Sequence, residues 1–285
     1  MATYNSAKYL EECLKSVFQS VPVNRLIVAD HDSTDGTLEI LEKYDALILP
    51  EQNGLGYARQ LTIDKSETPI ITFIDSDVIF ESMSWWYEAY ATMKSDVKIG
   101  AVCSEIDEDR LETPRMKYLR FWNKVVPSTF WNNVAPFTKR FGLTLSSTLI
   151  KRDLIKDIRI PAILDAREDR FLELNLLRKG YCVKYVSTRG THYFDYSLKK
   201  AHWSGANTRL FEELMYDPEQ ANIFWLLCRR LPMAFLKGIP PALYYRDPVI
   251  IVWNAQHWWG FLRGWLEPYK YRKHIRSAGD KHYVH

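Results

Sequence analysis

Two aspartates at the end of an apolar run constrain this chain more than any other feature. Residues 70–74 read Ile-Ile-Thr-Phe-Ile, which is typical of a buried strand, and Asp75-Ser76-Asp77 follows directly. Side chains two apart on an extended chain point to one face, so the two carboxylates can converge where strand gives way to loop. Hard cations such as Mg²⁺ and Mn²⁺ prefer carboxylate oxygens and phosphates. The pattern therefore predicts a divalent-cation site. The alternative is a strand-end Asp75 that caps a helix, with Asp77 solvated.

Strands and helices alternate around this pair of aspartates. A short apolar strand ends at Asp30, and Ser33 or Thr34 is expected to cap the helix that follows. Alternation with helix-length crossovers predicts an α/β fold with a doubly wound, mostly parallel sheet and ligand-binding loops at the carboxyl ends of its strands. The other expected elements are a helix over 9–17, strands over 25–30 and 46–50, helices over 38–44 and from 53, and a strand over 141–150.

The chain resembles the family 2 glycosyltransferases, which have the nucleotide-sugar-binding GT-A (Rossmann-like) fold. Five segments carry the resemblance in order: Thr3-Tyr4-Asn5, Asp30 with 33–37, Asn53-Gly54 through Arg59, Asp75-Ser76-Asp77, and Glu168-Asp169. They span about the first two-thirds of the chain. The resemblance implies sugar transfer with inversion from a UDP- or GDP-sugar, with Mn²⁺ or Mg²⁺ as cofactor.

The resemblance also implies roles for single residues. Tyr4, Asn5 and Asp30 would line the nucleoside pocket, with Asp30 accepting a hydrogen bond from the base, and Arg59 would lie near the ribose or diphosphate. Asp77 would bind the metal with help from Asp75. The donor site would also include Thr3, Asn53, Gly54 and Ser76. Without the resemblance, the glycines can simply permit a turn and Arg59 can be a solvated helix charge. His31 and Asp32 stand where the family usually has Asp and Gly, so the base preference is left open.

A second acidic pair opens a predicted helix. Glu168-Asp169 begins an amphipathic stretch that ends at Lys179-Gly180, with Gly180 as the candidate C-cap. The resemblance makes Asp169 the general base that takes the acceptor proton, with Glu168 beside it. The alternative is that the pair only stabilises a helix N-terminus through its dipole. His192 lies where the family often has a histidine near the metal, and a structural histidine is the competing interpretation.

Aromatic and basic residues crowd two later parts of the chain. The segment 115–141 suits sugar stacking or a phosphate-bearing lipid acceptor, and it equally suits a cover over the sheet. After residue 218, apolar blocks rich in Trp and Tyr are too short for a spanning helix, which needs roughly 18–20 apolar residues. We therefore expect residues 1–217 to form the catalytic domain. Residues 218–285 would form an amphipathic helical segment on an anionic membrane surface, with packing on the catalytic domain or on a second subunit as the alternative.

Composition constrains the function and location of the chain less than the motifs do. A formal charge of +3 is too small to argue for nucleic acid, and the 4 cysteines lack metal or redox spacing, which suits a reducing cytosol. The expected location is cytoplasmic, peripheral on the inner face of the cell membrane, and the expected acceptor is a glycan or a lipid-linked molecule. Met1-Ala2 alone precedes the first matching segment, so the first strand is either a stub or begins upstream of the given start. Two rival functions stay open: a phosphatase with Asp75 as nucleophile, and an inactive membrane scaffold that keeps the fold.

Overall fold

The structure is a computed structural model whose described residues fall into two compact units. The first unit comprises residues 1–107, 142–161 and 164–193, and the second comprises 112–125, 197–215 and 231–266. The expected boundary at 217/218 lies outside the described residues. Because α9 (Leu198–Met215) belongs to the second unit, that unit draws on residues from both sides of the expected boundary.

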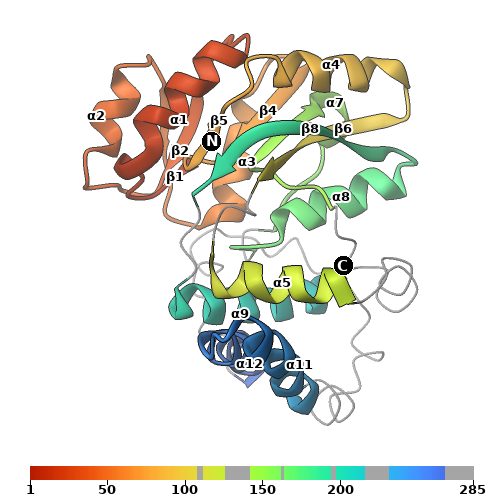
Figure 1. Cartoon of the computed structure of the whole chain (residues 1–285). Helices are drawn as coiled ribbons and strands as arrows, with labels where there is room; N and C mark the ends of the chain where they lie inside the picture. The colour runs from red at the N-terminus through yellow and green to blue at the C-terminus, as the bar shows by residue number, and fades with distance from the viewer. Residues whose placement is uncertain (108–111, 126–141, 162–163, 194–196, 216–230, 267–285) are drawn as a thin grey trace. The chain divides into compact units, whose positions relative to one another are not determined.

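The first unit contains an alternation of strands and helices (Figure 1). Its strands are β1 (Ala2–Thr3), β2 (Ile27–Asp30), β3 (Leu47–Pro50), β4 (Ile70–Ile74), β5 (Val78–Phe80), β6 (Ile99–Asp107), β7 (Ser147–Lys151) and β8 (Cys182–His192). Its helices are α1 (Ala7–Ser20), α2 (Thr37–Glu42), α3 (Leu55–Lys65), α4 (Trp85–Ser95), α7 (Arg152–Ile155) and α8 (Glu168–Arg178).

The strands form two sheets of different character. The three-stranded sheet has the order β1-β2-β3 and is wholly parallel, as expected. The five-stranded sheet has the order β4-β7-β6-β8-β5, where β6–β8 is parallel and the other three pairings are antiparallel. The α/β class is confirmed, and the second sheet is more mixed than the sequence suggests. Antiparallel neighbours need no helical crossover, so the rhythm of strands and helices does not reveal them.

Two local expectations are wrong. The strand expected over 141–150 begins only at Ser147; Leu143 and Leu145 are buried without joining the sheet, so their apolar pattern reports burial and not pairing. Neither Ser33 nor Thr34 caps α2.

Gly36 is the N-cap residue of α2, and Asp35 supplies the carboxylate that accepts the backbone N–H of Thr37 (3.2 Å) and of Ala7 at the start of α1 (3.0 Å). The hydroxyl of Ser33 is directed instead to buried Asp30 (2.6 Å). One carboxylate thus serves two helix N-termini, where donors outnumber acceptors.

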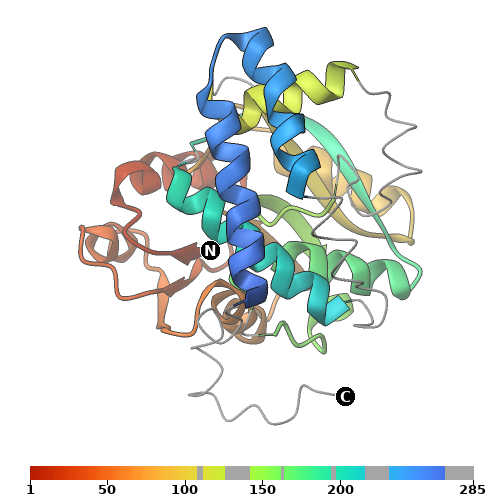
Figure 2. The same cartoon turned by 90° about the horizontal axis from the view of Figure 1, so that it is seen from below.

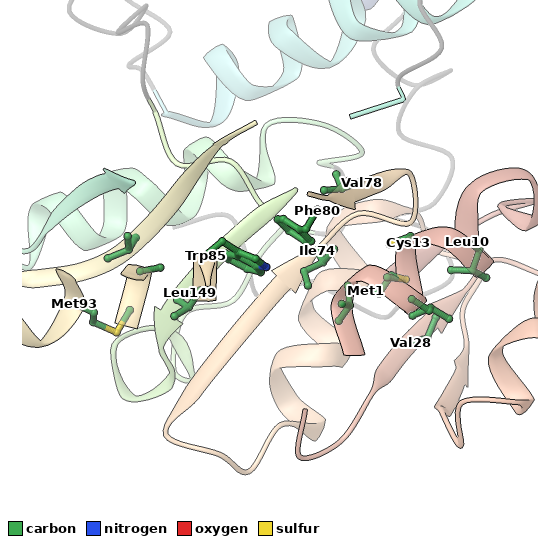
Figure 3. Packing of buried hydrophobic residues seen from close by; sticks show 14 of the residues in the cluster. Met1, Leu10, Cys13, Val28, Ile74, Val78, Phe80, Trp85, Met93 and Leu149 are labelled. Atoms are coloured by element: carbon green, nitrogen blue, oxygen red, sulfur yellow. The ribbon is translucent and has the colours of Figure 1, made fainter. Parts of the chain in front are cut away.

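A hydrophobic core between α1, α4 and the second sheet fixes the strand ends that matter below. Fully buried Trp85 stacks on Phe80 at a centroid distance of 4.2 Å, and its indole N–H donates to Ser20 Oγ (2.9 Å). Figure 3 shows this pair with Ile74 and Cys13 in the same cluster. Because Ile74 and Val78 are both core residues, the loop 75–77 is held at each end by packing.

The second unit is a helical assembly of α5 (Pro114–Val125), α9, α11 (Leu231–Tyr245) and α12 (Val249–Leu266). The aromatic residues of α5 pack within it: Tyr118 lies against Trp253, and Trp122 donates its indole N–H to the Lys237 carbonyl (3.1 Å). These side chains of α5 therefore pack among helices, which is neither of the two roles expected for the aromatic segment; Phe130, Trp131 and Phe137 lie outside the described residues. Among the helices described, none combines the length and the apolar character that crossing a bilayer requires.

Close contact between α9 and α12 depends on glycines. A Cβ at Gly205 would lie 1.9 Å from the His257 carbonyl oxygen, and one at Gly260 would lie 1.9 Å from that of His202. The helices therefore approach backbone to backbone at this crossing, which small residues permit.

We expect Gly260→Ala to destabilise the helical unit by about 1–3 kcal/mol or more, because the added methyl has backbone and no flexible side chain to displace. Gly238→Ala is the matched control, since its Cβ would meet its nearest neighbour at 3.3 Å and alanine favours helix. Thermal unfolding of the two variants checks this. Equal melting temperatures would contradict the close crossing.

Candidate active site

Loops at the carboxyl ends of the strands are linked by hydrogen bonds. The Ser76 hydroxyl donates to Ser6 Oγ (3.0 Å), which connects the loop after β4 to the loop after β1. The Asn5 backbone N–H donates to Ser33 Oγ (2.9 Å), and the Thr34 N–H donates to Asn5 Oδ1 (2.9 Å), which connects the loops after β1 and β2. Loops at this edge of an α/β sheet are where such folds bind ligands.

Asp75, Asp77 and His192 converge at this edge. One ligand-capable atom from each lies within 4.8 Å of the others, and His192 Nε2 is 3.1 Å from Asp77 Oδ1. The pairing of β5 with β8 produces this convergence, because Val78 lies opposite His192 in the register and the Tyr193 N–H donates to the Asp77 carbonyl (2.8 Å). Two carboxylates and an imidazole are a donor set that suits Mn²⁺, so these residues fit a divalent metal.

Arg59 is a buried cation between two acidic groups. Its side chain is 3% exposed; Nη2 pairs with Asp75, and Nε lies 3.9 Å from Glu168 Oε1. Burial works against the charge of Arg59, yet the charges of Asp75 and Glu168 keep its pKa above the ordinary value. Burial likewise tends to raise the pKa of Asp75, but the charges of Arg59 and His192 bring it below the ordinary value. Nη1 of Arg59 is buried without a hydrogen-bond partner among the described residues.

The acidic pair Glu168-Asp169 opens α8, as the sequence predicts. Arg167 precedes it in the left-handed region (φ 74°), and the Arg170 backbone N–H donates to Asp169 Oδ1 (2.6 Å). Burial, followed by the charge of Asp169, raises the pKa of Glu168 to about 8. Burial also raises the pKa of Asp169. The charge of Asp169 contributes to the rise at Glu168, so the two neighbouring carboxyls titrate as a pair.

Asp30 is committed to the fold. Its buried carboxylate accepts hydrogen bonds from the Thr3 hydroxyl (2.7 Å), the Ser33 hydroxyl (2.6 Å) and the Ser33 backbone N–H (2.8 Å). Tyr4, from the same predicted set, is 63% exposed and lies edge-on to His31 at 5.3 Å. The structure therefore brings these four residues together, with Thr3 and Asp30 as buried supports and Tyr4 and Asn5 as exposed side chains.

Two contributors escaped the sequence analysis. Glu51, directly after β3, accepts the backbone N–H of Asn53 (2.7 Å) and of Gly54 (2.9 Å), and its other oxygen lies 2.9 Å from His31 Nδ1. The sequence does carry a signal for Glu51, because it is an acidic residue at the end of a strand, as Asp30 and Asp75 are.

Asp165, the second contributor, accepts the N–H of Leu55 at the start of α3 (3.2 Å), although 110 residues separate the two. No local pattern reports so distant a contact. It ties the N-terminus of the helix that carries Arg59 to the loop that precedes Glu168.

Gly54 is required where α3 meets Asp165. Its φ is +96°, and a Cβ there would lie 1.9 Å from Asp165 Oδ1. We expect Gly54→Ala to lower stability by more than about 1 kcal/mol, from backbone strain plus displacement of Asp165. Gly180→Ala is the matched control, since Gly180 also has positive φ (+81°) but open space around its Cβ. Thermal unfolding compares the two; a smaller loss at Gly54 than at Gly180 would contradict the contact.

Comparisons with known proteins match the chain to one family and one fold. Residues 1–159 match the family model described as glycosyl transferase family 2. The chain is 34% identical over 233 residues to the putative teichuronic acid biosynthesis glycosyltransferase TuaG of Bacillus subtilis, covering 73% of this chain and 83% of that protein. It is 27% identical over 208 residues to the poly(ribitol-phosphate) beta-N-acetylglucosaminyltransferase TarS of Staphylococcus aureus, covering 67% of this chain. The match spans only 34% of TarS, about a third of that relative's length.

A solved structure shares the fold. The mannosyltransferase PcManGT from Pyrobaculum calidifontis, in complex with GDP-Man and Mn²⁺, superposes with a TM-score of 0.62 at 15% identity, covering 93% of this chain and 86% of that one. At this identity the likeness establishes the α/β fold of the GT-A type.

Proposed function

The chain belongs to glycosyl transferase family 2, and on that premise we propose that it transfers a hexose from a UDP- or GDP-sugar to a hydroxyl or phosphate acceptor with inversion. One observation carries the proposal: Asp75, Asp77 and His192 converge within 4.8 Å, and Arg59 connects Asp75 to the acidic pair at the start of α8. A metal site, a cation and a raised-pKa carboxyl pair are the groups that departure of a diphosphate and deprotonation of an acceptor require.

Asp77, Asp75 and His192 would hold Mn²⁺ or Mg²⁺. Bound there, the ion stabilises negative charge on the departing nucleoside diphosphate. Arg59 keeps Asp75 ionised through its charge, and its buried Nη1 is a further donor for a diphosphate oxygen. The Mn²⁺ bound by PcManGT, together with this donor set, supports the assignment.

Asp169 is the proposed general base. Inversion requires the acceptor oxygen to attack from the face opposite the diphosphate while it loses a proton, and an ionised carboxylate can take that proton. Burial and the charge of Asp169 raise the pKa of Glu168 to about 8, so Glu168 favours its acid form and Asp169 is the member of the pair that we assign as the base.

The nucleoside would lie over the loops after β1 and β2. Tyr4 offers an exposed ring and Asn5 a polar edge, whereas Thr3 and Asp30 hold the loop from beneath. Asn53, Gly54 and Ser76 would complete the donor site, where Glu51 holds the backbone of the first two and Ser76 is bonded to Ser6.

The proposed acceptor is a glycan or a lipid-linked molecule such as a polyprenyl phosphate. TarS is named for a poly(ribitol-phosphate) acceptor and TuaG for teichuronic acid biosynthesis, which supports an anionic polymer or its lipid-linked precursor. With such an acceptor the enzyme would work at the inner face of the cell membrane, bound peripherally to anionic lipid.

Incubation with a panel of UDP- and GDP-sugars, with Mn²⁺ and candidate acceptors, tests the proposed function. Release of nucleoside diphosphate together with a glycosylated acceptor supports it. Release of free phosphate from phosphate esters would support the Asp75-nucleophile phosphatase, and binding without any release would support the inactive scaffold.

Asp77→Ala should abolish Mn²⁺-dependent donor binding while the fold stays intact, because Asp77 is at a loop edge and its side chain is 27% exposed. Titration of UDP and GDP with and without Mn²⁺ measures this, and Asp157→Ala, which changes an exposed carboxylate in the turn after α7, is the matched control. Unchanged metal dependence in Asp77→Ala would remove Asp77 from the metal site.

Asp169→Asn should lower the transfer rate by about 10²–10⁴ with donor affinity nearly unchanged, as expected for a base that acts only in the chemical step. In the wild type, transfer should rise with pH through the raised pKa of Asp169, because only the ionised form accepts a proton. The pH profile of the rate checks the sign. A rate that falls as pH increases through the acidic range, or a fully active Asn variant, would exclude Asp169 as the base.

A further inference from the structure

The helices α11 and α12 form an antiparallel hairpin within the second unit. Only residues 246–248 separate them, and a Cβ at Gly238 of α11 would lie 3.3 Å from the Ile251 Cα of α12. Figure 2 shows the two helices side by side. Gly260 and Gly264 of α12 face α9, where added Cβ atoms would meet His202 and Ala206. Each helix thus has one side that is turned toward its neighbours.

The opposite sides of both helices expose apolar side chains. On α11, Leu236, Ile239 and Leu243 recur at helical spacing and are 55%, 40% and 74% exposed. On α12, four apolar residues lie on one stripe of the helix and are about half exposed: Val249, Val252, Trp259 and Leu266.

The two stripes share one face of the hairpin. Each residue advances about 100° around a helix, and in antiparallel neighbours that rotation runs in opposite senses when viewed from one end. Counted from the contact between Gly238 and Ile251, both stripes fall on the same side, away from the α9 contact at Gly260. We call these seven residues, Leu236, Ile239, Leu243, Val249, Val252, Trp259 and Leu266, the hairpin face.

Positive charges outnumber negative ones within the hairpin. Within residues 231–266 the sequence holds three cations, Lys237, Arg246 and Arg263, and a single acid, Asp247. Asp247 forms an ion pair with Lys117 of α5 (2.9 Å), so its charge is compensated within the unit. Exposed Arg246 lies at the turn between the helices, and Arg263 lies on the stripe of α12. An apolar face with a basic margin complements an anionic bilayer, whereas a second copy of the same face would bring like charges together.

We infer that the hairpin face is the surface that enters the headgroup–acyl boundary of an anionic membrane, with exposed Arg246 at the lipid phosphates. This inference deepens the membrane partner of the proposed function and rests on it for the biological setting. It places the contact on seven named residues that lie flat on the bilayer, with Trp259 at the depth where amphipathic rings prefer to sit.

Flotation of the full chain with vesicles tests the inference. The probe is vesicles of equal parts phosphatidylcholine and phosphatidylglycerol, compared with phosphatidylcholine alone. Leu243→Gln/Trp259→Gln removes two large side chains from the hairpin face, and Tyr87→Gln/Val97→Gln removes two from the first unit with comparable exposure (58% and 83%). We expect the hairpin variant to partition at least about tenfold less and the control to float like the wild type.

A third variant, Arg246→Gln, tests the charge. It should weaken binding to the anionic vesicles and leave the weaker binding to neutral vesicles unchanged. Melting temperatures and Mn²⁺-dependent nucleotide binding establish that all variants are folded.

Three results would overturn the inference. They are flotation of the hairpin variant at the wild-type level, failure of the wild type to float, and a wild-type dimer in solution that the hairpin variant dissociates, which would make the face a self-association surface. A chain that floats as expected but releases no nucleoside diphosphate would leave the inference standing and defeat the proposed function.

Discussion

The site depends on one buried cation. Arg59 is a buried residue of α3, and its charge is tolerated there because Asp75 and Glu168 lie against it. The dependence is mutual, because without Arg59 the carboxyl groups of Glu168 and Asp75 would lose the cation that they share, and removal of one partner from a buried pair typically costs about 3–5 kcal/mol. Arg59 therefore joins the loop after β4 to the start of α8, so the metal-ligating and proton-accepting groups share one support.

That arrangement explains why two neighbouring acidic groups behave differently. The charges of Arg59 and His192 lower the pKa of Asp75 and keep it ionised, as a metal-binding carboxylate must be. The pKa of Glu168 is instead raised to about 8, although Glu168 also faces Arg59. The difference arises from position: Asp75 takes the direct contact with the guanidinium, and Glu168 lies 3.9 Å from Nε with Asp169 as its sequence neighbour. The charge of Arg59 does not offset both the burial of Glu168 and the charge of Asp169, so the pKa of Glu168 at the start of α8 stays raised.

How far the sequence predicts the site depends on the range of the contacts. The aspartates after β4, the helix that begins at Glu168 and the carboxyl-edge loops follow from local patterns, since burial and helix periodicity are written in adjacent residues. The metal-site candidate His192 was proposed from family resemblance, and the structure shows why it reaches Asp77: an antiparallel pairing of β5 and β8 that the strand rhythm does not encode. The contact of Asp165 with Leu55 crosses 110 residues and left no local trace. Ser33 was misassigned as a helix cap because a buried Asp30 competes for its hydroxyl, and tertiary context decides that competition.

The two units are held together in different ways. In the first, polar side chains at the strand ends form hydrogen bonds inside the protein, and the polar side chains that stay exposed are available for chemistry. In the second, the helices meet through glycines, as at Gly205 and Gly260, which uses little apolar surface for the contact itself. Apolar side chains such as Ile250 and Phe261 are buried, while Leu243 and Trp259 are exposed on the hairpin face. The unit thus separates two uses of its helices: small residues let α9 and α12 approach closely, and the hairpin face keeps large apolar side chains available to a membrane.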